Sequence, residues 1–268
     1  MIMRIASLHR YPVKGLSAEL LARAVLQAGG YFPGDRLFAI ENGPSGFDAA
    51  DPQHQPKIRF LMLMRNEGLA RLRTTYEDET ATLVVRDGER ECVRGRLDTA
   101  GGRQAVADWF AGAFAAEMRG PAQVLAAPDG FRFTDSRLGH VSLINAASVV
   151  DLEGRIGAPV DPLRFRGNIL VEDLPAWAEH DWPAGHVVEA AGGVRFEVVK
   201  PIDRCAATNV DPATGIRDLS IPRALMQAYG HVDCGVYLKV LDGGAIAVGE
   251  RMRLSTARPS REAALGLR

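Results

Sequence analysis

The sequence contains few cysteines and no long hydrophobic run. Its three cysteines, Cys92, Cys205 and Cys234, lie far apart and form neither a CxxC pair nor the dense pattern of a disulfide scaffold. No apolar stretch reaches the roughly 18 residues that a membrane-spanning helix needs, and the first residues do not have the pattern of a signal peptide. We therefore expect a folded protein in the reducing cytoplasm, without a membrane span.

The sequence also lacks an excess of charge of either sign and several familiar motifs. Lys and Arg total 32 while Asp and Glu total 33, so there is no global basic field and we expect no binding of nucleic acid. No GxGxxG, GxxxxGK(S/T), HExxH or GxSxG run occurs, and the six histidines show no ligand spacing. These absences count against nicotinamide and zinc enzymes, and any anion site must be a local cluster of cations.

What is present indicates a mostly β protein of the α+β type. Short apolar runs are separated by Gly, Pro, Asn and Asp over residues 3–97 and again after residue 167. Helical spacing predicts one helix over residues 103–116, between Gly101-Gly102 and Gly120. It predicts another over residues 145–156, with Asn145 as its N-cap. Asp-Gly turns predict β-hairpins at residues 87–88 and 242–244.

A cysteine follows one of the strongest β patterns. A thiolate at Cys205 would be a soft ligand for a redox metal, and the adjacent Arg204 would favour the charged sulfur. Residues 211–215 have turn chemistry, which would hold the loop rigidly. A single cysteine beside a β run is more often a small buried hydrophobic residue, so the pattern alone favours that interpretation.

Two segments offer binding groups for an anion. Arg164 and Arg166 have the spacing that places both on one face of an extended segment, where they could hold a phosphate beside Asn168. The helix start from Asn145 to Ser148 could complete the site with free N–H groups. The alternatives are a solvated strand face for the arginines and a simple Asn-capped helix for residues 145–148.

Near the N-terminus, Lys14 lies between Val13 and Gly15, and Arg36 follows Gly34-Asp35. Both present a cation on a turn. The pattern does not distinguish them from ordinary exposed loop residues. Residues 133–136 have the pattern of a further polar turn, which could equally be an ordinary solvated loop.

Taken together, these segments resemble the MOSC family, named for the C-terminal domain of molybdenum cofactor sulfurases, preceded by the family's N-terminal β-barrel domain. Seven segments in the family's order carry the resemblance, and they are residues 11–15, 34–36, 145–149, 164–168, 204–208, 210–215 and 235–237. The resemblance implies an N-terminal β-barrel-like domain over residues 1–120, a β-barrel-like MOSC core over residues 121–255 and a tail over residues 256–268. The layout is most similar to the amidoxime-reducing components.

The resemblance also implies a site. Cys205 would be the protein ligand of molybdenum, whose other sulfurs come from a pterin dithiolene, and Asp203 would be a catalytic neighbour. Asp203 departs from the hydroxyl residue of some relatives, and Cys234 stands where an aromatic residue is common, so we expect it to fill the core. The implied cofactor-binding residues are Lys14, Arg36, Asn145, Ser148, Arg164, Arg166, Asn168, Arg204 and Thr208.

The implied function is reduction of small N-hydroxylated substrates by a molybdenum cofactor. No CxxxxCxxC run for an iron–sulfur cluster occurs, so we expect electrons from a separate ferredoxin-, flavodoxin- or cytochrome-like donor with its reductase. Two alternatives stay open: a sulfur carrier with a persulfide at Cys205, and a cofactor carrier without turnover of its own.

Overall fold

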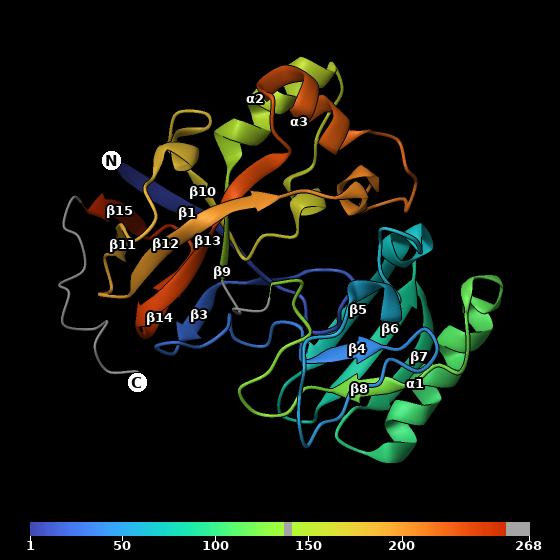
Figure 1. Ribbon diagram of the computed structural model, residues 1–268. Helices are drawn as coiled ribbons and strands as arrows, with labels where there is room; N and C mark the ends of the chain where they lie inside the picture. The colour runs from blue at the N-terminus through green and yellow to red at the C-terminus, as the bar shows by residue number, and fades with distance from the viewer. Residues whose placement is uncertain (137–140, 256–268) are drawn as a thin grey trace.

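The computed structural model describes residues 1–136 and 141–255, and its fold is mostly β, as the sequence predicts. Figure 1 shows one lobe built around long strands, with helices α2 (Ala146–Ile156) and α3 (Ile221–Tyr229) beside it, and a second lobe that contains helix α1 (Ala100–Ala113). Within the described ranges, no helix is long and apolar enough to cross a membrane. The expected tail over residues 256–268 lies outside the described residues.

Seven strands of the first lobe close into a barrel. In order around the barrel they are β1 (Ile2–Arg10), β10 (Ile169–Glu172), β9 (Val141–Asn145), β13 (Asp233–Asp242), β12 (Arg195–Asp203), β11 (Val187–Ala190) and β15 (Arg251–Ser255), which pairs with β1 again. Only the β9–β10 pair is parallel among these seven. A parallel pair needs a crossover, and helix α2 (Ala146–Ile156) supplies it.

The first strand of the chain closes this barrel. A register shift between Ile5 and Ser7 bends β1, so that its start pairs with β15 while its later residues pair with β10 and with β2 (Glu19–Leu21). Met3, Ile5 and Leu8 are fully buried in the barrel core. The core of the barrel therefore includes residues 2–10 together with strands from the second half of the chain.

The second lobe packs two small sheets against one helix. Strands β5 (Leu72–Glu77), β6 (Thr82–Asp87) and β7 (Arg90–Arg96) form an antiparallel meander, and β4 (Phe38–Ile40) pairs with β8 (Val124–Ala126). Helix α1 (Ala100–Ala113) buries Val106, Ala107 and Phe110 in the core that these strands share. Burying such side chains contributes roughly 1.5–3 kcal/mol each for the large ones, which holds this lobe together.

Both predicted helices form, but the first one begins and ends about three residues earlier than expected. Asn145 caps α2, since its side chain accepts a hydrogen bond from the N–H of Ala147 at 3.1 Å. Helix α1 begins at Ala100 rather than at residue 103, because Thr99 caps it and Gly102 lies against the backbone of Arg96, where a Cβ would clash. It ends at Ala113 and a 3-10 turn follows at Ala115–Glu117, so the expected helix over residues 103–116 is displaced.

The two predicted hairpins have different outcomes. The Asp87-Gly88 turn joins β6 to β7 as expected. The expected hairpin at residues 242–244 is wrong, because β14 (Gly244–Ala247) pairs with β3 (Arg23–Leu26) instead of folding back on β13. Gly243 makes this possible, since a Cβ there would lie 2.6 Å from the carbonyl oxygen of Leu26. The sequence pattern marked the point where β13 ends, but β14 follows after a single residue and has a different partner.

Candidate functional site

A cleft of about 830 Å³ contains most of the residues that the sequence analysis singled out. Residues of both lobes line it, and β9, β12, β13 and the loops after β1 and β8 all contribute. Nine of the predicted residues line this cleft, namely Lys14, Arg36, Arg164, Arg166, Asn168, Asp203, Arg204, Cys205 and Thr208. The two that do not are Asn145 and Ser148. Its charged lining is mainly cationic, which suits an anionic ligand.

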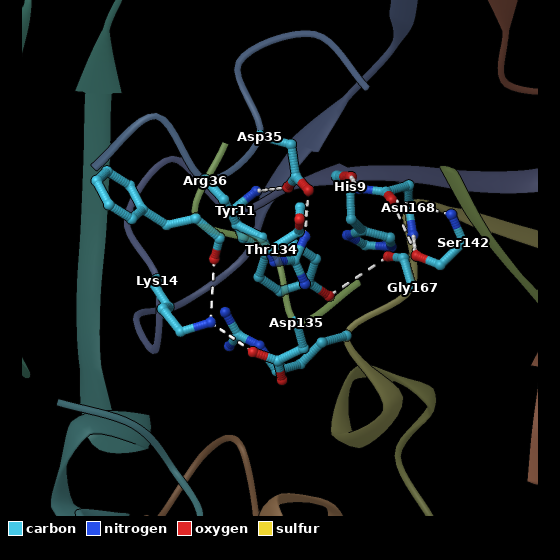
Figure 2. A network of polar contacts seen from close by, with 12 residues as sticks. His9, Tyr11, Lys14, Asp35, Arg36, Thr134, Asp135, Ser142, Gly167 and Asn168 are labelled. Carbon is cyan, nitrogen blue, oxygen red and sulfur yellow. Dashed lines mark hydrogen bonds and ion pairs between the residues drawn. The ribbon is translucent and has the colours of Figure 1, made fainter. Parts of the chain in front are cut away.

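Lys14 is buried and already has a carboxylate partner. It follows the isolated bridge between Val13 and Phe38, and its Nζ donates to Asp135 Oδ1 and to the carbonyl oxygen of Phe133 at 3.0 Å (Figure 2). Burial lowers the pKa of Lys14, and Asp135 offsets part of that effect. Against the effect of its own burial, the charges of Lys14 and Lys57 lower the pKa of Asp135 to about 2, so the carboxylate stays ionised.

Two arginines lie over the ring of Tyr11. The guanidinium carbon of Arg36 is 5.0 Å from the ring centroid and that of Arg166 is 4.3 Å away. Arg36 also pairs with Asp35, whose other oxygen accepts the N–H of Tyr11 at 2.8 Å. Burial and the charge of Arg36 lower the pKa of Arg166 to about 10. The ring of Tyr11 thus makes cation–π contacts with both of these partly buried arginines, which helps to hold them in place.

Arg166 keeps an unused donor. Its Nη1 donates to the carbonyl oxygen of Leu16 at 2.7 Å, but its Nη2 is buried and has no hydrogen-bond partner among the described residues. A buried polar group without a partner costs roughly 1–3 kcal/mol, so a ligand that accepts this hydrogen bond would gain affinity.

Arg164 and Arg166 do not share the face of an extended segment, so that expectation is wrong. Arg164 lies in the 3-10 helix η4 (Pro162–Phe165), and Arg166 caps it in the left-handed region with φ of 52°. The two side chains diverge, and Arg164 binds both oxygens of Asp218 at 2.8 and 2.7 Å and Asp211 at 3.1 Å. Most of its donors are therefore used within the protein.

Asn168, Arg204 and Thr208 hold the walls of the cleft. The side chain of Asn168 accepts from the backbone N–H and the hydroxyl of Ser142, and donates to the carbonyl oxygen of His9 at 3.2 Å (Figure 2). It thus ties β1, β9 and the start of β10 together. Arg204 donates to the carbonyl oxygens of Cys234 and Phe165, at 2.9 and 2.8 Å. These side chains face the cleft, yet their hydrogen bonds are mainly structural.

Cys205 follows β12 and begins the 3-10 helix η6 (Ala206–Asn209). Its carbonyl oxygen accepts from the N–H of Thr208 at 3.1 Å and from its hydroxyl at 2.9 Å, so the turn that carries the thiol is fixed. The thiol is partly exposed in the cleft wall. Asp203 lies two residues away with its side chain 75% exposed. This arrangement gives an external metal access to the sulfur.

Asn145 and Ser148 form a separate, closed cluster. Both are fully buried, and both donate to Glu179, at 2.8 Å from Asn145 Nδ2 and at 2.8 and 3.0 Å from Ser148 Oγ. Ser148 also accepts the N–H of Trp177 at 2.8 Å. A buried carboxylate therefore occupies the helix start that we expected to bind a phosphate, and the structure does not bring these residues to the cleft.

Sequence reasoning missed Lys57 and underrated Asp135. Lys57 lies in the 3-10 helix η1 (Lys57–Arg59) and lines the cleft. Burial opposes its charge, but the charges of Cys205 and Asp135 raise the pKa of Lys57 overall. No local pattern marks Lys57, because its neighbours form an irregular loop. Cys234, by contrast, fills the core as expected, and burial raises its pKa to about 12.

The chain is similar in sequence to several known proteins. The mitochondrial amidoxime-reducing component 1 of Danio rerio is 32% identical over 118 residues, which are 41% of this chain and 35% of that protein. The molybdenum cofactor sulfurase of Bos taurus is 23% identical over 270 residues, or 87% of this chain and 30% of its own length. The chain thus spans about a third of the length of these relatives.

Among solved structures, the YUAD protein from Bacillus subtilis covers 94% of both chains at 11% identity with a TM-score of 0.45. Two family models cover most of the chain. The MOSC N-terminal beta barrel domain matches residues 2–121, and the MOSC domain matches residues 131–253. With both models in sequence order, the chain belongs to the MOSC domain family.

Proposed function

We propose that this chain binds a molybdenum cofactor in the cleft and reduces small N-hydroxylated molecules with it. The observation that carries the proposal is the position of Cys205, a partly exposed thiol in the wall of a cation-rich cleft. Of the other two cysteines, Cys234 is buried in the core and Cys92 lies on β7, away from the cleft. The similarity to an amidoxime-reducing component and to a molybdenum cofactor sulfurase supports the same chemistry.

The residues present fit a phosphate-bearing cofactor with a thiolate ligand. Among the described residues, seven cationic side chains and two carboxylates line the cleft, and the cations are Lys14, Arg36, Lys57, Arg164, Arg166, Lys200 and Arg204. The buried Nη2 of Arg166 has no partner in the described part of the chain and needs an acceptor. Phosphate oxygens are strong acceptors for such guanidinium groups. A terminal phosphate would therefore satisfy both the charge and the unused donor.

The roles follow from the contacts of each residue. We assign the phosphate to Lys14, Arg36 and Arg166 and the metal to Cys205, while Thr208 fixes the turn that carries the thiol. When bound, the cofactor supplies two-electron transfer with oxygen exchange at its metal. Reduction of an N–O bond to an amine also consumes two protons and releases water. We propose that Asp203, which is exposed near Cys205, sets the local charge at the metal and the access to it.

We propose that electrons come from a separate donor protein of the ferredoxin, flavodoxin or cytochrome type with its reductase. The three cysteines are all free thiols, which supports the cytoplasmic location that we also propose. A second candidate function is sulfur transfer through a persulfide at Cys205. It is favoured by the match to the molybdenum cofactor sulfurase, which extends over 87% of this chain.

The test is turnover by protein made in cells that synthesise the cofactor. With reduced viologen as electron donor, the holoprotein should convert benzamidoxime to benzamidine, and oxidation of the donor should match formation of product. Cys205→Ser should lose this activity because it lacks the soft ligand, whereas Cys92→Ser should retain it. Protein that turns over no N-hydroxylated compound, but carries a persulfide at Cys205 from which a thiol reductant releases sulfide, would establish sulfur transfer instead.

A further inference from the structure

A side chamber adjoins the cleft that contains Cys205. Its volume is about 400 Å³, within the usual range of small-molecule pockets, and it shares His54, Thr134 and Ser136 with the cleft. None of the cofactor residues assigned above lines it. The chamber also contains Tyr31 and Arg132. A molecule that occupies it could therefore extend into the cleft toward Cys205.

Arg132 brings a positive charge into this chamber without a matching carboxylate. Its guanidinium carbon is 5.5 Å from the ring centroid of Tyr31, and its Nη1 donates to the carbonyl oxygen of Phe131. Among the residues that the structure describes, no carboxylate lies within 4.0 Å of it, and its Nε is buried without a partner. Burial lowers the pKa of Arg132, and the charges of Tyr31 and Asp129 offset this only in part.

The segment that carries Arg132 is held in place by aromatic packing. The rings of Phe131 and Phe133 on either side of it are 5.4 Å apart, and both contact Phe47, at 5.3 and 4.9 Å. Phe133 also packs edge-on against Phe60. Because its neighbours are fixed, Arg132 loses little additional freedom when it binds a ligand, which favours affinity.

His54 supplies a second unused polar group. Its Nε2 is buried and has no hydrogen-bond partner within residues 1–136 and 141–255. The residue lines both the chamber and the cleft, so it lies where the two meet. An arginine and a histidine with unused nitrogen atoms are suited to hold one carboxylate, whose two oxygens can accept from both side chains. A single arginine is less suited to a phosphate dianion.

We propose that this side chamber binds the carboxylate of an acidic substrate, through Arg132 and His54, while the N-hydroxylated group of the same molecule reaches the cleft at Cys205. The proposal rests on the proposed function and adds its substrate class. It predicts that the protein prefers amidoximes that carry a carboxylate at a suitable distance from the N–O group.

The experiment compares amidoximes that bear a terminal carboxylate on methylene chains of increasing length with the matching neutral carboxamides. One chain length should give a kcat/KM at least about tenfold higher for the acid than for the amide, the value of one charge-assisted hydrogen bond. Arg132→Gln should abolish this preference mainly through KM and leave the neutral compounds unchanged. Arg65→Gln is the matched control, because Arg65 is exposed and lies beside residues that line the cleft but outside the chamber.

Binding of the corresponding amidine products, measured by calorimetry, gives a result that does not depend on turnover. Tighter binding of the acid to the wild type, lost in Arg132→Gln and weakened in His54→Gln, would support the chamber even if Arg132→Gln alone folded poorly. Equal kcat/KM and equal affinity for acids and amides at every chain length would overturn the inference. Absence of turnover with all the amidoximes, with the binding preference intact, would instead overturn the proposed reductase function.

Discussion

Two polar clusters of this protein look alike in sequence and differ in structure. The start of α2, with Asn145 and Ser148, and the cleft around Arg166 were both expected to bind a phosphate. At the helix start, Glu179 already accepts the hydrogen bonds of both residues. In the cleft, cations outnumber carboxylates and Arg166 retains a donor without a partner in the described chain. Residue type alone does not make a binding site; what decides is whether the protein already satisfies the group.

The closed cluster should govern stability and have no part in ligand binding. Glu179→Ala removes a fully buried acceptor of three hydrogen bonds and leaves a cavity, so the free energy of unfolding should fall by about 2–4 kcal/mol. Bound pterin per folded chain should not change. Chemical denaturation measures the first and pterin fluorescence the second.

Glu172→Ala is the control for that variant. Glu172 pairs with Arg4 at the surface, where an ion pair contributes about 0–1 kcal/mol. If Glu179→Ala were as stable as Glu172→Ala, or lost its pterin while still folded, the division between a structural cluster and a binding cluster would be wrong.

Arg164 and Arg166 should show the same contrast, with smaller effects: the first should matter for stability and the second for cofactor binding. Arg164→Ala leaves Asp218 and Asp211 without their partner, and because both aspartates are partly exposed we expect a loss of about 1–3 kcal/mol of stability. Arg166→Ala removes a buried cation whose charge Arg36 already disfavours. Its stability should change by less than about 1 kcal/mol, while retention of pterin and molybdenum should fall. Equal cofactor content in the two variants would remove Arg166 from the binding set.

The sequence predicted these elements unevenly, for identifiable reasons. Asn145 was placed correctly as an N-cap because capping is a local interaction. The helix α3 (Ile221–Tyr229) was not predicted, although Pro222 in its first turn and Gly230 after it are ordinary boundary signals. Closure of the barrel by β1 depends on pairing between the two ends of the chain, which no local pattern contains.

The site shows the same limit. Cys205, Lys14 and Arg36 could be proposed from the resemblance, and all three line one cleft. Glu179, which occupies the α2 start, comes from a segment more than thirty residues later. Lys57 lies in the short 3-10 helix η1, far from Cys205 in the sequence, and only the fold brings both to the same cleft. Contacts between distant segments decide which polar groups remain available, and the sequence pattern does not record them.

The smallest effect concerns the ion pair of Lys14 and Asp135. The pKa of Asp135 is lowered from 3.8 to about 2, so the pair stabilises the fold above pH 4 and its contribution is lost as the pH falls from about 4 to about 2. Asp135→Asn should therefore flatten the fall in the free energy of unfolding over this range, by a modest amount because the carboxylate is half-exposed. Asp108→Asn, on the exposed face of α1, should leave the pH profile unchanged. A profile for Asp135→Asn identical to the wild type would show that the pair contributes nothing.

The central claim is that Cys205 holds molybdenum in the cleft. The most direct measurement is molybdenum per folded chain, determined by elemental analysis with pterin fluorescence on wild type, Cys205→Ser and Cys92→Ser purified from cells that make the cofactor. We predict molybdenum and pterin in equal amounts in the wild type and in Cys92→Ser. In Cys205→Ser we predict a lower molybdenum content, and a changed spectrum for any metal that remains. Wild-type molybdenum content with an unchanged metal spectrum in Cys205→Ser would contradict the assignment.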